Sequence, residues 1–167
     1  PNLKFVKNNF LISFIFVGLI FLIDRISKII VVKKSIEIEN SKTFSSKFIN
    51  FDLIWNKGIA FGLFSVNQGA IYQLITLLIV IIVIILIYLM NRSKNFEKFS
   101  LILILGGALG NLFDRIFYKA VPDFIDFHIG EFHWFIFNVA DIFISLGVFF
   151  MILLELIGNN KNVNEIV

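Results

Sequence analysis

The run "IYQLITLLIVIIVIILIYLM", from Ile71 to Met90, decides the fold class of this chain. Its apolar character is interrupted only at Tyr72, Gln73, Thr76 and Tyr88. An α-helix rises about 1.5 Å per residue, so about 20 such residues cross the roughly 30 Å hydrocarbon layer of a bilayer. We therefore expect a membrane-spanning helix over this run.

Three further apolar runs flank it, which gives expected spans at about residues 10–32, 70–90, 99–118 and 134–157. The chain is 58% hydrophobic and 16% charged, whereas a soluble domain carries about a quarter charged residues. Only helices and closed barrels satisfy backbone polar groups in lipid, and a barrel needs alternating rather than solidly apolar segments. The sequence predicts an all-α membrane protein with four transmembrane helices, in a single integral-membrane domain over residues 1–167.

The ends of the spans favour one orientation. Lys4 and Lys7 precede the first run as in a secretory signal, but no small-x-small cleavage site follows, so a retained signal-anchor helix is expected. Four spans put both termini on one side, together with the short turn "NRSKNFEK" (Asn91–Lys98) and its three basic residues. Basic residues in short loops favour the cytoplasm, so cytoplasmic termini are expected.

Two segments between the spans carry irregular sequence. The first contains "KFINFDLIWNKGIAFGLFS" (Lys47–Ser65), in which β-prone residues predict short strands that turn around residues 56–58 near the membrane surface. The second, Lys119–His133, holds Pro122, Asp123, Asp126 and Glu131 and is expected to be a loop before the last span.

Ionisable residues inside a span cost about 2.5–3.5 kcal/mol each, so they are expected to face a bundle interior or a wet cavity. Asp24 and Lys28 are four residues apart on one helix and predict an ion pair. Asp114 and its neighbour Arg115 are interpreted as a second structural pair. The GxxxG motif Gly106–Gly110 permits close helix packing.

Asp141 is the acid best suited to chemistry. It follows Asn138 by three residues, has no cation within a helical turn and begins a long apolar run. Asp123 and Asp126 are the nearest preceding acids, and the residues alone leave both open as its partner. Two carboxylates that share one proton can activate a water and protonate a leaving group, as in aspartic proteolysis.

Other site chemistries are disfavoured. The chain has no cysteine, which excludes disulfides, thiolate chemistry and zinc–sulfur sites. Metal ligation by His128 and His133, five residues apart, is considered improbable, and Ser100 and Ser145 lack a base motif that would make either a nucleophile. No cofactor and no metal are expected.

Five motifs of the chain occur in the order of a known family: "DRISK" (Asp24–Lys28), "NKGIAF" (Asn56–Phe61), "GGALGNLFDR" (Gly106–Arg115), "VPDFIDF" (Val121–Phe127) and "FNVAD" (Phe137–Asp141). With them the chain resembles the bacterial lipoprotein signal peptidases, signal peptidase II. One departure is Pro122, where the family usually has an aliphatic residue; proline removes a backbone donor and restricts Val121 to extended geometry.

The resemblance implies an aspartic endopeptidase that removes signal peptides from diacylglyceryl-modified prolipoproteins, cutting before the lipidated cysteine. It implies Asp123 and Asp141 as the catalytic pair and so selects Asp123 over Asp126. The matching substrate-binding or supporting positions are Asn56, Asn111, Arg115, Asn138, Ala140, Asp24 and Asp114.

It also implies a small extracytoplasmic β-sheet cradle beside four transmembrane helices, and a short surface helix before the last span. The expected location is the bacterial cytoplasmic (inner) membrane, with the active site near the extracytoplasmic surface. The expected partners are prolipoprotein substrates and membrane lipid, without nucleic acid, and a monomer is expected.

Three rival functions use the same acids differently. A small transporter or proton relay would use Asp24, Asp114 and Asp141 and move protons or solute without cutting peptide. A metal-dependent lipid phosphotransferase would bind Mg²⁺ through carboxylates and lose activity to a chelator. A non-catalytic assembly factor would tolerate Asp→Asn changes at the candidate pair.

Overall fold

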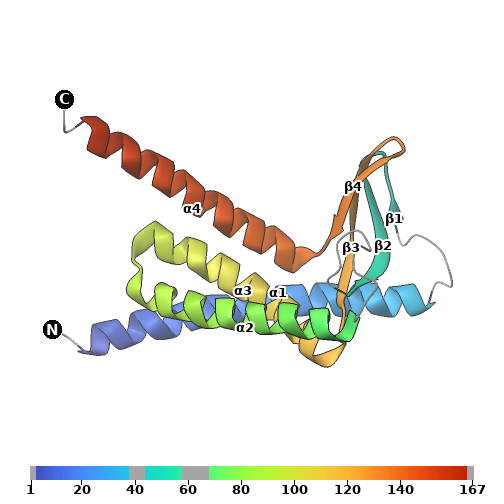
Figure 1. Ribbon diagram of the computed structural model, residues 1–167, viewed down its shortest axis with the longest axis horizontal. Coiled ribbons are helices and arrows are strands. Elements are labelled where there is room, and N and C mark those ends of the chain that lie inside the picture. Colours follow the sequence, from blue (N-terminus) through green and yellow to red (C-terminus); the bar gives the residue numbers. More distant parts are fainter. Residues whose placement is uncertain (1–2, 38–43, 58–67, 165–167) are drawn as a thin grey trace.

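The computed structural model describes residues 3–37, 44–57 and 68–164. Four helices and four strands follow one another along the chain: α1 (Leu3–Glu37), β1 (Phe44–Ser45), β2 (Ile49–Asn56), α2 (Gln68–Arg92), α3 (Asn95–Phe117), β3 (Val121–Ile129), β4 (Phe132–Phe137) and α4 (Val139–Asn164). Helix α3 packs against each of the other three helices. The sheet stands across one end of the helices (Figure 1).

Three helices in the described part of the chain are long and apolar enough to cross a membrane: Gly69–Arg92, Asn95–Phe117 and Val139–Ile157. The first two match, in length and composition, the spans expected near 70–90 and 99–118. The last span was expected from residue 134, but it starts at Val139 because residues 132–137 form β4. The expected span at 10–32 lies within α1, whose crossing of a membrane stays a prediction.

Close packing around α3 depends on its glycines. A Cβ at Gly107 would overlap the Ala140 carbonyl oxygen of α4, and a Cβ at Gly110 would lie 2.5 Å from Oδ2 of Asp24 on α1. The small residues therefore let both helices approach α3, as the GxxxG motif predicts. The buried apolar core beside them includes Val17, Ile20, Val83, Met90, Leu101, Leu105 and Leu112.

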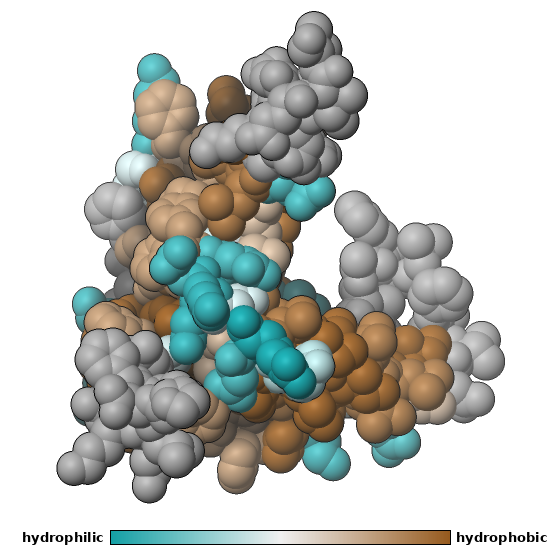
Figure 2. Space-filling view, turned by 90° about the vertical axis from the view of Figure 1, so that its left-hand side faces the viewer, coloured by the Kyte–Doolittle hydropathy of each residue, from teal (hydrophilic) through white to brown (hydrophobic). Residues whose placement is uncertain are grey.

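The outward faces of the helices are apolar. Large exposed side chains include Leu11, Ile15 and Leu19 on α1, Leu74, Leu78 and Ile84 on α2, and Phe149, Ile152 and Leu156 on α4. Figure 2, viewed from the end remote from the sheet, shows hydrophilic side chains gathered in its middle beside hydrophobic surface. The α2–α3 turn with its exposed Arg92 and Lys94 lies at that end (Figure 1).

The sheet is antiparallel, in the order β1-β2-β3-β4. Strand β2 confirms the strand expected in this region, while residues 58–67, and with them most of the "NKGIAF" motif, lie outside the described residues. The loop expected at 119–133 is wrong: most of it forms β3 and the turn to β4. The short surface helix expected before the last span is wrong for the same reason. Aromatic and β-branched residues fill both strands, and such side chains favour a pleated surface.

Two backbone features set the direction of β3. Lys119, just after α3, has φ 55°, the left-handed conformation that commonly ends a helix. The Tyr118 N–H still donates to the Asp114 carbonyl at 2.8 Å, so the chain leaves the helix within two residues. At the far end of the strand Gly130 has φ 61° and opens the tight turn into β4. Asp123 is thereby held close to the end of α3.

Candidate functional site

Asp123 lies on β3 and is 4% exposed. Its two carboxylate oxygens accept hydrogen bonds from two amides: Asn56 Nδ2 donates to Oδ2 at 2.9 Å and Asn138 Nδ2 donates to Oδ1 at 2.6 Å. Burial raises the pKa of Asp123 above its ordinary value, and the nearby Asp141 charge adds to this, while the two amide donors oppose it. Burial therefore favours the protonated form of Asp123 more than water does.

Asp141 lies in the first turn of α4, where Asn138 is the N-cap residue. The Asn138 side-chain oxygen accepts from the Asp141 N–H at 3.2 Å, and Oδ2 of Asp141 accepts from the Asn138 N–H at 3.1 Å. This reciprocal pair is a capping box with Asn and Asp in place of the usual Ser/Thr and Glu. The helix start therefore fixes the position of the Asp141 carboxylate.

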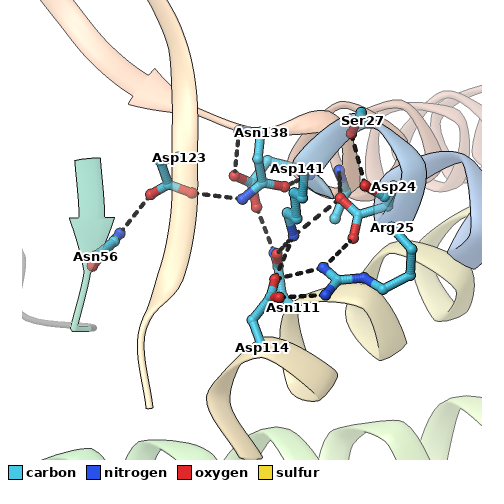
Figure 3. A network of polar contacts seen from close by, with 11 residues as sticks. Asp24, Arg25, Ser27, Asn56, Asn111, Asp114, Asp123, Asn138 and Asp141 are labelled. Atoms are coloured by element: carbon cyan, nitrogen blue, oxygen red, sulfur yellow. Dashed lines mark hydrogen bonds and ion pairs between the residues drawn. The ribbon is translucent and has the colours of Figure 1, made fainter. Parts of the chain in front are cut away.

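Asn138 joins the two acids. Its side chain donates to Asp123 and its backbone N–H donates to Asp141, and the residue is completely buried. Figure 3 shows the chain of contacts running from Asn56 through Asp123 and Asn138 to Asp141. A strand-borne and a helix-borne carboxylate thus meet around one amide residue.

Asn111 on α3 extends the chain of contacts to a cation. Its Nδ2 donates to Oδ1 of Asp141 at 2.7 Å, and its Oδ1 accepts from Lys28 Nζ at 2.9 Å. Because the Asn138 N–H occupies the other oxygen, both Asp141 oxygens have a fixed donor. Lys28 is 2% exposed and therefore acts on the site from within the protein.

Lys28 belongs to a buried ion network between α1 and α3. Arg25 donates through both terminal nitrogens to Asp114, at 2.5 and 2.7 Å, and also to Asp24 at 2.8 Å. Lys28 Nζ lies 3.0 Å from Asp24 and 2.7 Å from Asp114. The charges of the two carboxylates and the two cations therefore balance, as buried charges require (Figure 3).

The network confirms the Asp24–Lys28 ion pair and corrects the expected Asp114–Arg115 pair. Asp114 binds Arg25 and Lys28 on α1. Arg25 approaches α3 closely enough to make a bidentate contact with the Asp114 carboxylate. Asp24 makes a further link: its Oδ1 accepts the backbone N–H of Ala140 at 3.0 Å. A carboxylate of α1 thus caps the first turn of α4, where anions are favourable.

Arg115 contacts a different element. Its guanidinium lies 5.8 Å from the ring centroid of Tyr72 on α2, and the Tyr72 hydroxyl donates to the Arg115 carbonyl at 2.8 Å. Nε and Nη1 of Arg115 are buried without a hydrogen-bond partner among the residues that the structure describes.

Asp126 faces away from this arrangement. It lies three positions after Asp123, and this odd spacing puts the two side chains on opposite faces of β3. Its contacts are with His133 and Asn50. Residues that sequence reasoning missed are Arg25, as partner of Asp114, and the capping role of Asn138. The Asn-x-x-Asp spacing before an apolar run was the available signal for the cap.

Comparisons with known proteins show the family and agree with the fold. The model of the family described as Signal peptidase (SPase) II matches residues 16–157. The lipoprotein signal peptidase of Pelagibacter ubique (strain HTCC1062) is 50% identical over 165 residues, covering 98% of this chain and 96% of that protein. The lipoprotein signal peptidase of Anaplasma phagocytophilum (strain HZ) is 38% identical over 149 residues, covering 87% and 92%.

Solved structures also share the fold of this chain. Two, both described as bacterial membrane enzyme structures, align with TM-scores of 0.70 and 0.71 at 29% and 30% identity. The first alignment covers 90% of each chain, and the second covers 86% of this chain and 92% of the other. The similarity therefore extends over the helices and the sheet together.

Proposed function

This chain belongs to the signal peptidase II family, and on that premise we propose that it cuts lipid-modified precursors with a pair of aspartates, Asp123 and Asp141. The proposed substrates are diacylglyceryl-modified prolipoproteins, cut just before the lipidated cysteine. The observation that carries the assignment of the acids is that Asn138 binds both carboxylates at once, from a buried position.

The proposed reaction needs one proton shared between the two acids. The ionised carboxylate takes a proton from a water molecule, which attacks the scissile carbonyl carbon, while the neutral acid protonates the carbonyl oxygen. The resulting tetrahedral intermediate collapses when a proton reaches the leaving nitrogen and the C–N bond breaks. Burial, which raises the pKa of Asp123, favours a proton held by the pair.

Neighbouring residues would hold this pair in place. Asn56 and Asn138 fix the two oxygens of Asp123, and Asn111 fixes one oxygen of Asp141. Ala140, bound through its N–H to Asp24, holds the α4 terminus against α1. Asp114 supports the site indirectly, since it binds the Lys28 that contacts Asn111. The donors of Arg115 that have no partner within residues 3–37, 44–57 and 68–164 suit a substrate carbonyl or the glyceride oxygens of the lipid.

We also propose that α1 is a fourth span and that the termini are cytoplasmic. Its 35 residues give a length of about 52 Å, and exposed apolar side chains such as Leu11 and Leu19 suit lipid contact. Exposed aromatic side chains of the sheet, including Trp55 and Trp134, suit the opposite membrane interface. The signal helix would lie beside the bundle, with lipid tails entering sideways from the bilayer, and the enzyme would act as a monomer.

Purified variants and a lipidated precursor test the catalytic pair. Asp123→Asn and Asp141→Asn are each expected to lower turnover by at least about a hundredfold, since each removes a positioned acid or base. Asp52→Asn, an exposed carboxylate on the adjacent β2, is the matched control and should keep full turnover. An unlipidated precursor should remain uncut. Near-normal turnover in either Asp123→Asn or Asp141→Asn would remove the pair from the mechanism.

A further inference from the structure

Three metal-ligating side chains converge on the β3–β4 hairpin, on the face of β3 opposite Asp123. Asp126 and His128 lie on β3 and His133 lies on β4, where it pairs directly with His128 across the strands. One ligand atom from each of the three residues lies within 4.8 Å of the other two. This cluster takes no part in the proposed reaction.

His128 carries an unsatisfied polar atom. The residue is 9% exposed, and its buried Nδ1 has no hydrogen-bond partner among the residues that the structure describes. The two imidazole rings are stacked, with centroids 5.2 Å apart and planes 22° from parallel. An unpaired buried nitrogen costs free energy, and a metal ion bound to its lone pair is a partner that would remove this cost.

Asp126 is already oriented toward the same point. Both of its oxygens contact Nδ1 of His133, at 3.0 and 2.8 Å, and Asn50 Nδ2 lies 3.4 Å from Oδ2. The Ser45 hydroxyl in turn donates to the Asn50 side-chain oxygen at 2.8 Å. Such outer hydrogen bonds fix the direction of a ligating carboxylate. The carboxylate is therefore held in one orientation rather than free to rotate.

We propose that Asp126, His128 and His133 bind a divalent transition-metal ion of the Zn²⁺ type, at a site separate from the catalytic pair. Two imidazoles and one carboxylate suit Zn²⁺ better than Mg²⁺. At metal–ligand distances of about 2.0–2.2 Å, tetrahedral ligand atoms lie about 3.3 Å apart, so the three groups need only a small further approach. The His133 side chain is 49% exposed and gives the ion a route from solvent.

This site departs from the expectation that the histidines bind no metal. That expectation rested on the absence of cysteine near two histidines in a loop. The structure instead has them opposite each other on paired strands, and β3 brings Asp126 as the third ligand.

The consequence of binding is a clamp on the hairpin. The ion would cross-link β3 to β4, three residues along β3 from Asp123, and β4 leads directly into the α4 cap at Asn138. Because an ion that binds only the folded chain stabilises it, Zn²⁺ should raise the melting temperature. Since the catalytic acids are not ligands, turnover of the wild-type enzyme below its melting range should stay within twofold of its value without metal.

Titration of chelator-treated, tag-free protein in detergent tests the proposal. His128 and His133 are the only two histidines of the chain, and it has no cysteine, so histidine-dependent binding can come from no other place. Calorimetry with ZnCl₂ should give one ion per chain, with MgCl₂ giving no comparable binding. His133→Asn and His128→Asn should each weaken Zn²⁺ binding at least tenfold and remove the gain in melting temperature.

Glu131→Gln is the matched control, since Glu131 is an exposed acid in the hairpin turn between the ligands. It should bind Zn²⁺ as the wild type does. The half-exposed His133 gives a variant that is expected to fold even if His128→Asn does not. Zn²⁺ binding that survives His133→Asn unchanged, or that Glu131→Gln weakens equally, would overturn the proposal, as would equal binding of Mg²⁺. None of these results bears on cleavage by Asp123 and Asp141.

Discussion

At the scale of single residues, Asn138 has two roles: it caps the start of α4, and it binds Asp123. The three-residue spacing from Asn138 to Asp141 suggests a shared helical face, whereas the structure uses it as a reciprocal helix cap. The side-chain amide that remains then holds Asp123. Local spacing could predict the cap. The contact with Asp123 could not be predicted, because it depends on how the hairpin returns the chain to α4.

Two substitutions at Asn138 should separate the cap from the link to Asp123. Serine is also a good N-cap residue, whereas alanine cannot accept the Asp141 N–H, a loss of typically about 1 kcal/mol. We therefore expect Asn138→Ser to melt at a higher temperature than Asn138→Ala. Both should lose turnover at least about tenfold, since alanine has no donor and the serine hydroxyl is too short to reach Asp123 from the cap position. Thermal melts and precursor cleavage measure the two effects, and full turnover in Asn138→Ser would contradict the role of the amide.

The raised pKa of Asp123 predicts that the stability of the folded protein depends on pH. A folded-state pKa above the ordinary 3.8 means that the folded chain binds the proton more tightly than the unfolded chain. Stability that depends on this group is therefore present at low pH and falls as pH rises through the window above 3.8. Asp123→Asn lacks the titration, so its melting temperature relative to wild type should rise between about pH 4 and pH 7. A difference that is constant across this range would contradict the raised pKa.

At the scale of elements, α3 gathers the site because small residues let two helices reach it. The sequence predicted close packing from GxxxG, and it predicted the Asp24–Lys28 pair within one helix. The prediction from the sequence paired Asp114 with its neighbour Arg115, although Asp114 binds Arg25 of α1 instead. Partners within one helix follow from its period, whereas partners on two helices follow from their crossing, which the sequence does not give.

Gly110 provides a test of this packing. A Cβ at position 110 would lie 2.5 Å from Oδ2 of Asp24, so Gly110→Ala should displace a carboxylate that binds Arg25 and the α4 terminus. We expect a loss of about 1–3 kcal/mol, typical of overpacking, together with reduced turnover. Gly18→Ala on α1 is the matched control, because nothing lies within 4 Å of its added Cβ. Alanine there should be neutral or slightly stabilising, since it favours the helix. Equal melting temperatures for the two variants would show that α1 and α3 do not need the glycine.

At the scale of the whole molecule, apolar run length predicted the helices well and the connecting segments badly. The runs near 70–90 and 99–118 correspond to α2 and α3 because a helix long and apolar enough to cross a bilayer can be recognised from composition and length. The hairpin was missed because "FHWFIF" (Phe132–Phe137) is as apolar as the helix that follows it. Length and hydropathy do not distinguish a strand that packs on a sheet from the first turns of a span.

The orientation of the molecule can be tested because the chain contains no cysteine. If α1 crosses the membrane, the N-terminal end and the α2–α3 turn share one side, and the β3–β4 turn lies on the other. Single cysteines at Asn2, Lys94 and Glu131 should then react differently with a membrane-impermeant maleimide in spheroplasts. Glu131→Cys should be labelled in intact spheroplasts, whereas Lys94→Cys and Asn2→Cys should be labelled only after lysis. Labelling of Asn2→Cys without lysis, with Lys94→Cys still protected, would put the N-terminus outside and remove α1 from the spans. Labelling of both Lys94→Cys and Asn2→Cys in intact spheroplasts, with Glu131→Cys protected, would instead reverse the whole molecule, because the sheet and the turn lie at opposite ends of the helices (Figure 1).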